Sequence, residues 1–119
     1  MTGSTTNARV RDHHEDDPSP YAETVSPANG AATAVAANTR AHVVNPDGTN
    51  AVDLDAAARE GHRVTVVHNG GANTPTLSFT DADFVGTGPA NITSAGATAT
   101  LLNVDGTTSG WVVVATGSA

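Results

Sequence analysis

The stretch that most constrains the fold covers residues 61–80, GHRVTVVHNGGANTPTLSFT. It holds two segments with strand patterns. Residues 64–67 are a β-branched run, and residues 75–80 alternate Leu77 and Phe79 against Thr and Ser. Between them, Asn69-Gly70-Gly71 can adopt the positive φ angles of a tight reversal. The stretch therefore predicts a β-hairpin or two adjacent strands.

The chain has 119 residues, which is the size of one domain. Aromatic residues make up only 3% of it, so Val, Leu and Ala must fill most of the interior. We expect a thin core, and a thin core favours support from an oligomeric neighbour.

The formal net charge of -7 argues against a nucleic-acid-binding protein and against attachment to an anionic membrane surface. Lys is absent. A Lys-free, acidic composition rich in Ala, Thr and Gly resembles the proteins of extreme halophiles, and a genome rich in G and C is the alternative explanation. The basic residues are all Arg: Arg9, Arg11, Arg40, Arg59 and Arg63.

Cysteine is absent, so neither disulfides nor thiolate chemistry is expected. No apolar run approaches the roughly 20 residues of a membrane span, and the amino terminus lacks the apolar core of a signal peptide. The sequence thus predicts a soluble protein made in the cytoplasm.

Residues 1–23 are polar, charged and broken by Pro18 and Pro20. We expect a flexible amino-terminal arm that is either disordered or ordered against a neighbouring subunit. Residues 24–119 then form the folded module.

Turn signals divide this module into short strands. Asn45-Pro46-Asp47-Gly48 predicts a turn between strands at 40–44 and 49–54, and Asp105-Gly106 predicts a hairpin turn before a last strand at 111–116. That last strand is apolar on both faces and is expected to be buried on both sides.

The connecting segments have patterns of their own. Residues 55–61 predict one helical turn, with Asp55 as its cap and Gly61 at its end. Residues 81–92 predict a long loop in which Phe84 and Val85 pack against the sheet.

Strand signals at intervals of about 8 to 12 residues favour an all-β fold, a small antiparallel β-sandwich or barrel of about six to eight short strands with one helical turn. The expected core and scaffold residues are Val64, Val66, Leu77, Phe79, Leu101, Trp111 and Val113.

Candidate catalytic groups are sparse. His42, His62 and His68 lie in or beside strands and are expected at the surface or at strand edges, because no Ser or Cys nucleophile stands in a recognisable turn. The cluster at residues 13–17, HHEDD, has metal-ligand types without a fixed geometry. We expect no enzyme activity.

Several short motifs carry only weak signals. Asp53 with Asp55, and Asp81 with Asp83, fit a solvated acidic face better than a cation site. Residues 86–89 lack the strand and helix of a phosphate-binding loop. Residues 103–106 lack the Glu that would complete a calcium loop. We expect no cofactor and no metal site; Asn91-Ile92-Thr93 is a glycosylation sequon, so Asn91 is a hypothetical glycosylation site.

Taken together, the order of these segments resembles β-rich virion proteins of tailed viruses. The resemblance covers residues 33–115 and rests on a Gly that opens a "vtv.N.gg" strand, an "n.vtl" strand and a closing "dGt..W.vv" hairpin. The matching positions are Gly61, Val64 to Val66, Asn69 to Gly71, Leu77, Asp105 to Thr107, and Trp111 to Val113.

The resemblance implies a non-enzymatic virion protein that works as a homotrimer or another ring, next to the major capsid protein or neighbouring virion proteins. Because the chain is almost only this module, with no repeats and no second domain, a capsid decoration or turret protein is favoured over a complete tail fibre. The composition favours a virus of a halophilic archaeal host. The alternative is a host-receptor or carbohydrate-binding module of a tail fibre or tail tip.

Overall fold

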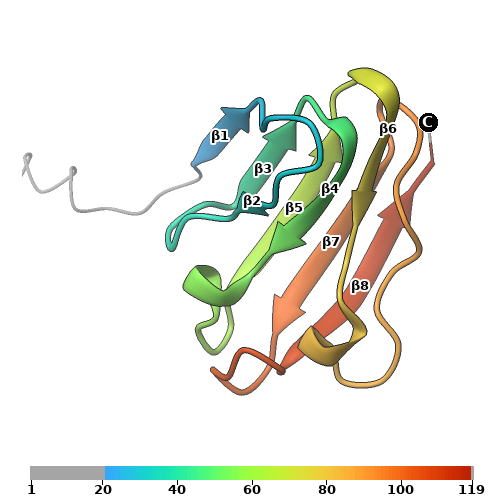
Figure 1. Ribbon diagram of the computed structural model, residues 1–119. Helices are drawn as coiled ribbons and strands as arrows, with labels where there is room; N and C mark the ends of the chain where they lie inside the picture. Colours follow the sequence, from blue (N-terminus) through green and yellow to red (C-terminus); the bar gives the residue numbers. More distant parts are fainter. Residues whose placement is uncertain (1–20, 119) are drawn as a thin grey trace, which may run out of the picture.

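The computed structural model describes residues 21–118, which form two facing β-sheets (Figure 1). The expected arm, 1–23, lies outside these residues except for its last three, two of which belong to the first strand. The strands are β1 (Ala22–Val25), β2 (Thr33–Ala34), β3 (Ala41–Val44), β4 (Asp47–Asp53), β5 (Arg63–His68), β6 (Ala72–Ser78), β7 (Thr98–Asn103) and β8 (Trp111–Gly117), with 3-10 turns η2 (Asp55–Ala57) and η3 (Asp81–Asp83).

The chain alternates between the two sheets. One sheet has the order β1-β3-β5-β7-β8 and the other the order β2-β4-β6. Neighbouring strands from β1 to β6 are parallel, so this part of the chain winds as a coil that contributes one strand to each sheet per turn. This is the winding of a short parallel β-helix. In the first turn, Ala22 pairs with Ala41 and Thr33 with Val52, a spacing of 19 residues.

Antiparallel strands close the coil at its carboxyl end. β7 pairs antiparallel with β5, and β8 pairs antiparallel with β7. The register shifts between Thr100 and Leu101, which leaves Val114 45% exposed. The hairpin turn predicted at Asp105-Gly106 is therefore confirmed.

The expectation of a strand-rich fold is confirmed. The strands form two sheets that are not clearly a sandwich or a barrel, and the expected antiparallel pairing is wrong for β1 to β6. Residues 61–80 do not form a hairpin, because β5 and β6 lie in different sheets. Asn69-Gly70-Gly71 is a corner of the coil. The Asn69 N–H donates to Val44 O, and the Ala72 N–H donates to Pro46 O, so the corner bonds to the preceding turn of the coil.

Side chains of equivalent corners form a ladder across three turns of the coil. Asn69 Nδ2 donates to Asn45 Oδ1 at 2.8 Å, and Asn45 Nδ2 donates to Ser26 Oγ at 3.1 Å. Each residue directly follows a strand of the five-stranded sheet. The ladder holds the corners in register.

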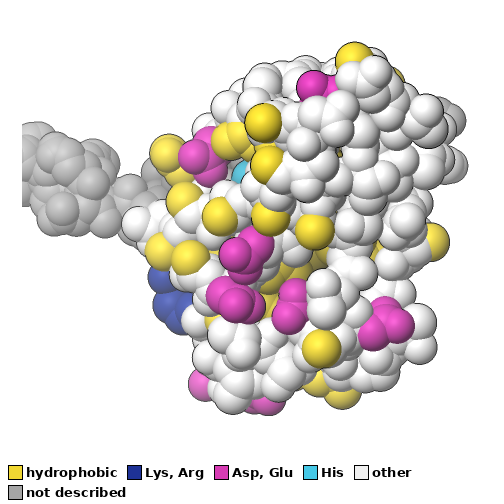
Figure 2. Space-filling model, viewed as in Figure 1, with side chains coloured by type: hydrophobic (Ala, Val, Ile, Leu, Met, Phe, Trp, Pro, Cys, Tyr) yellow, Lys and Arg dark blue, Asp and Glu magenta, His cyan; other side chains and the backbone are white. Residues whose placement is uncertain are grey.

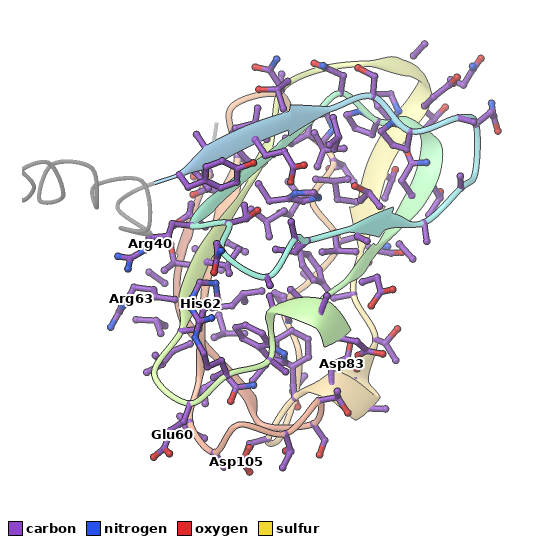
Figure 3. The ribbon with its side chains drawn as sticks, turned by 90° about the vertical axis from the view of Figure 1, so that its left-hand side faces the viewer. Arg40, Glu60, His62, Arg63, Asp83 and Asp105 are labelled. Carbon is purple, nitrogen blue, oxygen red and sulfur yellow. The ribbon has the colours of Figure 1, made fainter. Side chains whose placement is uncertain are left out.

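The core lies between the sheets, as the edge-on view in Figure 3 shows. Of the expected core residues, Val64, Val66, Leu77, Leu101 and Trp111 are fully buried. Phe79 and Val113 are partly buried and pack against this core.

Three local expectations need correction. β8 is an edge strand and is not buried on both sides. Val85 is 57% exposed, although Phe84 is buried as expected. The turn at Asp55–Ala57 has no side-chain cap from Asp55; instead, Asp53 Oδ1 accepts from the Asp55 N–H at 3.0 Å.

Candidate functional site

A Thr-His-Glu arrangement, in which the Thr and the His are buried and the Glu is partly exposed, lies at the amino-terminal part of the core. Thr33 Oγ1 is 2.9 Å from His42 Nε2, and Glu23 Oε1 is 3.9 Å from His42 Nδ1. The Nδ1 atom has no hydrogen-bond partner. Burial lowers the pKa of His42 below its ordinary value of 6.5, and the nearby Glu23 partly opposes this.

This arrangement is not organised for catalysis. A nucleophile must reach its substrate, and Thr33 is only 4% exposed, while His42 is completely buried. The 3.9 Å separation also leaves Glu23 too far from Nδ1 to orient the ring by a hydrogen bond. The group is a polar element of the core.

The other two histidines are also buried, so the expected surface or edge positions are wrong for all three. His62 Nε2 donates to Thr39 O at 2.8 Å, and His68 Nε2 donates to Pro75 O at 3.1 Å. The Gly70 N–H donates to His68 Nδ1. The His62 ring links two turns of the coil and the His68 ring links β5 to β6 within one turn, because their polar atoms need partners once buried.

The two acidic pairs meet at the surface. Burial raises the pKa of Asp83, and repulsion from Asp55 and Asp53 adds to this effect. Figure 2 shows acidic side chains gathered on the face that contains η2 and η3. Within residues 21–118, no group of three or more His, Cys, Asp or Glu side chains is placed to hold a metal ion. The cluster at 13–17 lies outside the described residues.

The loop at 81–92 is fastened to both sheets. Phe84 forms a bridge with Trp111, and Ile92 forms one with Leu77. Asn91 is exposed, as the sequon requires. Beside it, a groove of about 360 Å³ runs between residues 89–94 and the ends of β7 and β8.

The β7–β8 turn is held by its own side chains. Asn103 Oδ1 accepts from the Gly106 N–H at 2.6 Å, and Asp105 Oδ1 accepts from the N–H and hydroxyl of Thr107. These bonds lower the pKa of Asp105. The turn has the structural role that the sequence predicted.

The outer side of the five-stranded sheet is named here the flat face. Strand alternation points small and β-branched residues outward from it, and Arg63 at one end is its only charged residue among those described. The flat face comprises Ala22, Thr24, Ala41, Val43, Arg63, Thr65, Val67, Thr98, Thr100, Leu102, Val112, Ala115 and Gly117.

A second surface feature was not predicted from the sequence. Every Arg of residues 21–118 lies at one cavity of about 310 Å³, lined by Arg40, Arg59, Glu60, Gly61, His62 and Arg63; we name it the arginine pocket. Figure 2 shows dark blue side chains only at one edge of the visible face. Arg40 lies beside residues 59–63 only because β3 and β5 pair in parallel. The spacing of the Arg residues along the chain therefore did not predict the pocket.

No protein-family model matches the sequence, and no curated protein matches it either. Over residues 21–118, none of the helical segments has the length and apolar character needed to cross a membrane.

Proposed function

We propose that the chain is a non-enzymatic structural protein of a virion, a capsid decoration or turret component that coats or stabilises the shell through oligomeric β-modules. Two observations support it: the sequence resemblance to virion proteins of tailed viruses, and the flat face. The module is a sandwich only in the broad sense that two sheets enclose one core.

The flat face carries the proposal. The chain has 12 acidic residues, yet none of those described lies on this face. Val43, Val67 and Leu102 are only partly buried there. An acid-free sheet face with small side chains can approach another such face closely. Contact between two such faces buries apolar surface, and this adds to the small apolar area that the thin core buries. Copies of this chain are therefore the proposed occupants.

The wider setting follows from the same proposal. Copies joined by the flat face would form a homotrimer or another ring on the major capsid protein or on neighbouring virion proteins. The acidic remainder of the surface suits a virus of a halophilic archaeal host, and neither nucleic acid nor membrane is a proposed partner.

A matched pair of substitutions tests whether copies of the chain bind one another through the flat face. Thr65→Asp places a charge at the centre of the flat face, whereas Thr49→Asp places it on the exposed side of β4. We expect the first to raise the dissociation constant of the oligomer at least about tenfold and the second to leave it unchanged. Analytical ultracentrifugation measures both; a monomeric wild type, or equal effects of the two changes, would refute self-assembly through this face.

The virion assignment has its own test. Quantitative mass spectrometry of purified particles should find many copies of the chain per shell, and labelling should place them on the capsid surface. A few copies at a tail tip would favour the receptor-binding alternative. Absence from particles would refute both.

The receptor-binding alternative receives less support from the aromatic residues. Binding to sugar rings usually needs an exposed aromatic platform. Trp111 is fully buried and Phe84 is 6% exposed, so of the described aromatic residues only Tyr21 is largely accessible.

A further inference from the structure

We propose that the arginine pocket is an oxyanion-binding site, which takes a phosphate, sulfate or carboxylate group. This site shares Arg63 with the flat face but does not depend on the virion role. Three Arg residues line it in a chain with a net charge of -7.

The backbone brings these residues together. The Thr65 N–H donates to Arg40 O at 2.9 Å, which places Arg40 beside the start of β5, where Arg63 lies. The His62 N–H donates to Arg59 O at 2.9 Å and closes a tight turn that brings Arg59 to the same place. Figure 3 shows Arg40 and Arg63 projecting from the same side of the molecule, with His62 set back from them toward the interior.

Within residues 21–118, no acidic side chain pairs with these guanidinium groups, since no carboxylate oxygen lies within 4.0 Å of a guanidinium nitrogen. Glu60 lines the pocket but forms no such pair. Like charges gathered on a fixed backbone repel each other, and an anion between them would remove that repulsion.

His62 completes the site as a neutral group. Its Nε2 donates to Thr39 O, and Arg59 Nη2 donates to its Nδ1 at 3.3 Å. Burial lowers the pKa of His62, and Arg59 and Arg40 lower it further, although the bond to Thr39 opposes them. The ring thus fixes the Arg59 side chain and adds no fourth positive charge.

The ligand class follows from the donors. Guanidinium groups offer paired N–H donors that match two oxygens of one oxyanion. Such an anion can come from solution or from the chain itself, since Glu15-Asp16-Asp17 precedes Tyr21, whose carbonyl accepts from the Arg40 N–H. The four residue-to-residue steps from Asp17 to Tyr21 can span at most about 14 Å.

The test titrates full-length protein with inorganic pyrophosphate at low ionic strength and follows backbone amides and arginine Nε–H groups by NMR. We expect saturable shifts at residues 59–63. Arg40→Gln and Arg59→Gln should each weaken binding about tenfold, and Glu60→Gln should strengthen it. Arg11→Gln is the control with the same change in net charge and should bind as the wild type does.

A variant with Glu15→Gln, Asp16→Asn and Asp17→Asn separates the two sources. Tighter pyrophosphate binding in this variant supports occupation by the chain's own carboxylates, and unchanged binding supports an anion from solution. The proposal is overturned if neither the wild type nor this variant shows saturable shifts, or if Arg40→Gln and Arg59→Gln bind as tightly as Arg11→Gln.

Discussion

Asn45 and Asn69 occupy the same corner in successive turns of the coil, and the amide of Asn69 donates to the side-chain oxygen of Asn45 at 2.8 Å. Asn45 in turn donates to Ser26. The central residue of this ladder therefore makes two side-chain bonds and the last residue one. Substitution of Asn45 should therefore destabilise the fold more than substitution of Asn69.

We expect Asn45→Ala to lower the free energy of unfolding by about 1 kcal/mol and Asn69→Ala by about half as much, because these bonds lie at the solvent-exposed surface. Urea denaturation followed by circular dichroism measures both. Asn91→Ala, in an exposed loop position, is the control and should have almost no effect. Equal losses for Asn45 and Asn69 would contradict the ladder.

Gly71 lies where two corners touch. A Cβ atom at this position would be 1.8 Å from Pro46 O, so Gly71→Ala must push one turn of the coil away from the next. We expect a loss of at least about 3 kcal/mol in unfolding free energy.

Gly86→Ala is the matched control for Gly71→Ala. It has a φ of +87° but nothing within 4 Å of the added Cβ, so it should cost only about 1 to 2 kcal/mol. The same urea experiment compares the two. A smaller loss at Gly71 than at Gly86 would show that the corners do not pack as described.

Acid should destabilise the fold through His42. Its folded-state pKa lies below the ordinary value of 6.5, so the unfolded chain takes up the proton first. Stability is therefore complete above pH 6.5 and falls as the pH drops from 6.5 toward the folded-state pKa, by at most about 1.4 kcal/mol per pH unit for one group.

Unfolding free energies measured between pH 8 and pH 5 test this sign. His42→Gln should flatten the profile, and the remaining slope should come from His62, whose pKa is also lowered. A wild-type profile that is level or rises toward acid would contradict the effect.

Asp83 should respond in the opposite way to most surface carboxylates. Its raised pKa means that ionisation is disfavoured in the folded state, so stability should increase as the pH falls through its titration. Asp83→Asn should raise Tm by about 1 to 2 °C at neutral pH, and concentrated salt should remove only the smaller part of the gain, which comes from repulsion by Asp55 and Asp53. Asp105→Asn is the control of opposite sign, because hydrogen bonds from Thr107 lower the pKa of Asp105. Calorimetry at two salt concentrations distinguishes them.

Local patterns predicted the strands well. The β-branched run that includes Val64 and Val66 identified a strand, and the turn at Asp105-Gly106 identified a hairpin whose two strands are close in sequence. In both cases the deciding interactions lie within a few residues of each other. Burial of Trp111 followed from the same reasoning.

The pairing of the strands was harder to predict because an Asn-Gly corner looks the same in a hairpin and in a coil. The distinguishing signal was a weak repeat: Val25-Ser26-Pro27, Val44-Asn45-Pro46 and His68-Asn69-Gly70 occupy equivalent corners. The expectation of no internal repeats was therefore wrong. The unequal spacing of the repeat, 19 residues and then 24, concealed it.

The arginine pocket could not be predicted for a related reason. Arg40 and Arg63 are neighbours only because β3 and β5 are parallel and in register. An antiparallel pair would have placed these residues at opposite ends of the sheet.

The antiparallel closure by β7 and β8 has a consequence for how the chain folds. These two strands meet across a short turn, whereas each parallel pair must first close a much longer loop, which costs more entropy and slows pairing. The carboxyl-terminal hairpin is thus the natural nucleus, onto which β5, β3 and β1 add in reverse order of synthesis. We expect the coil to become stable only after β8 has left the ribosome.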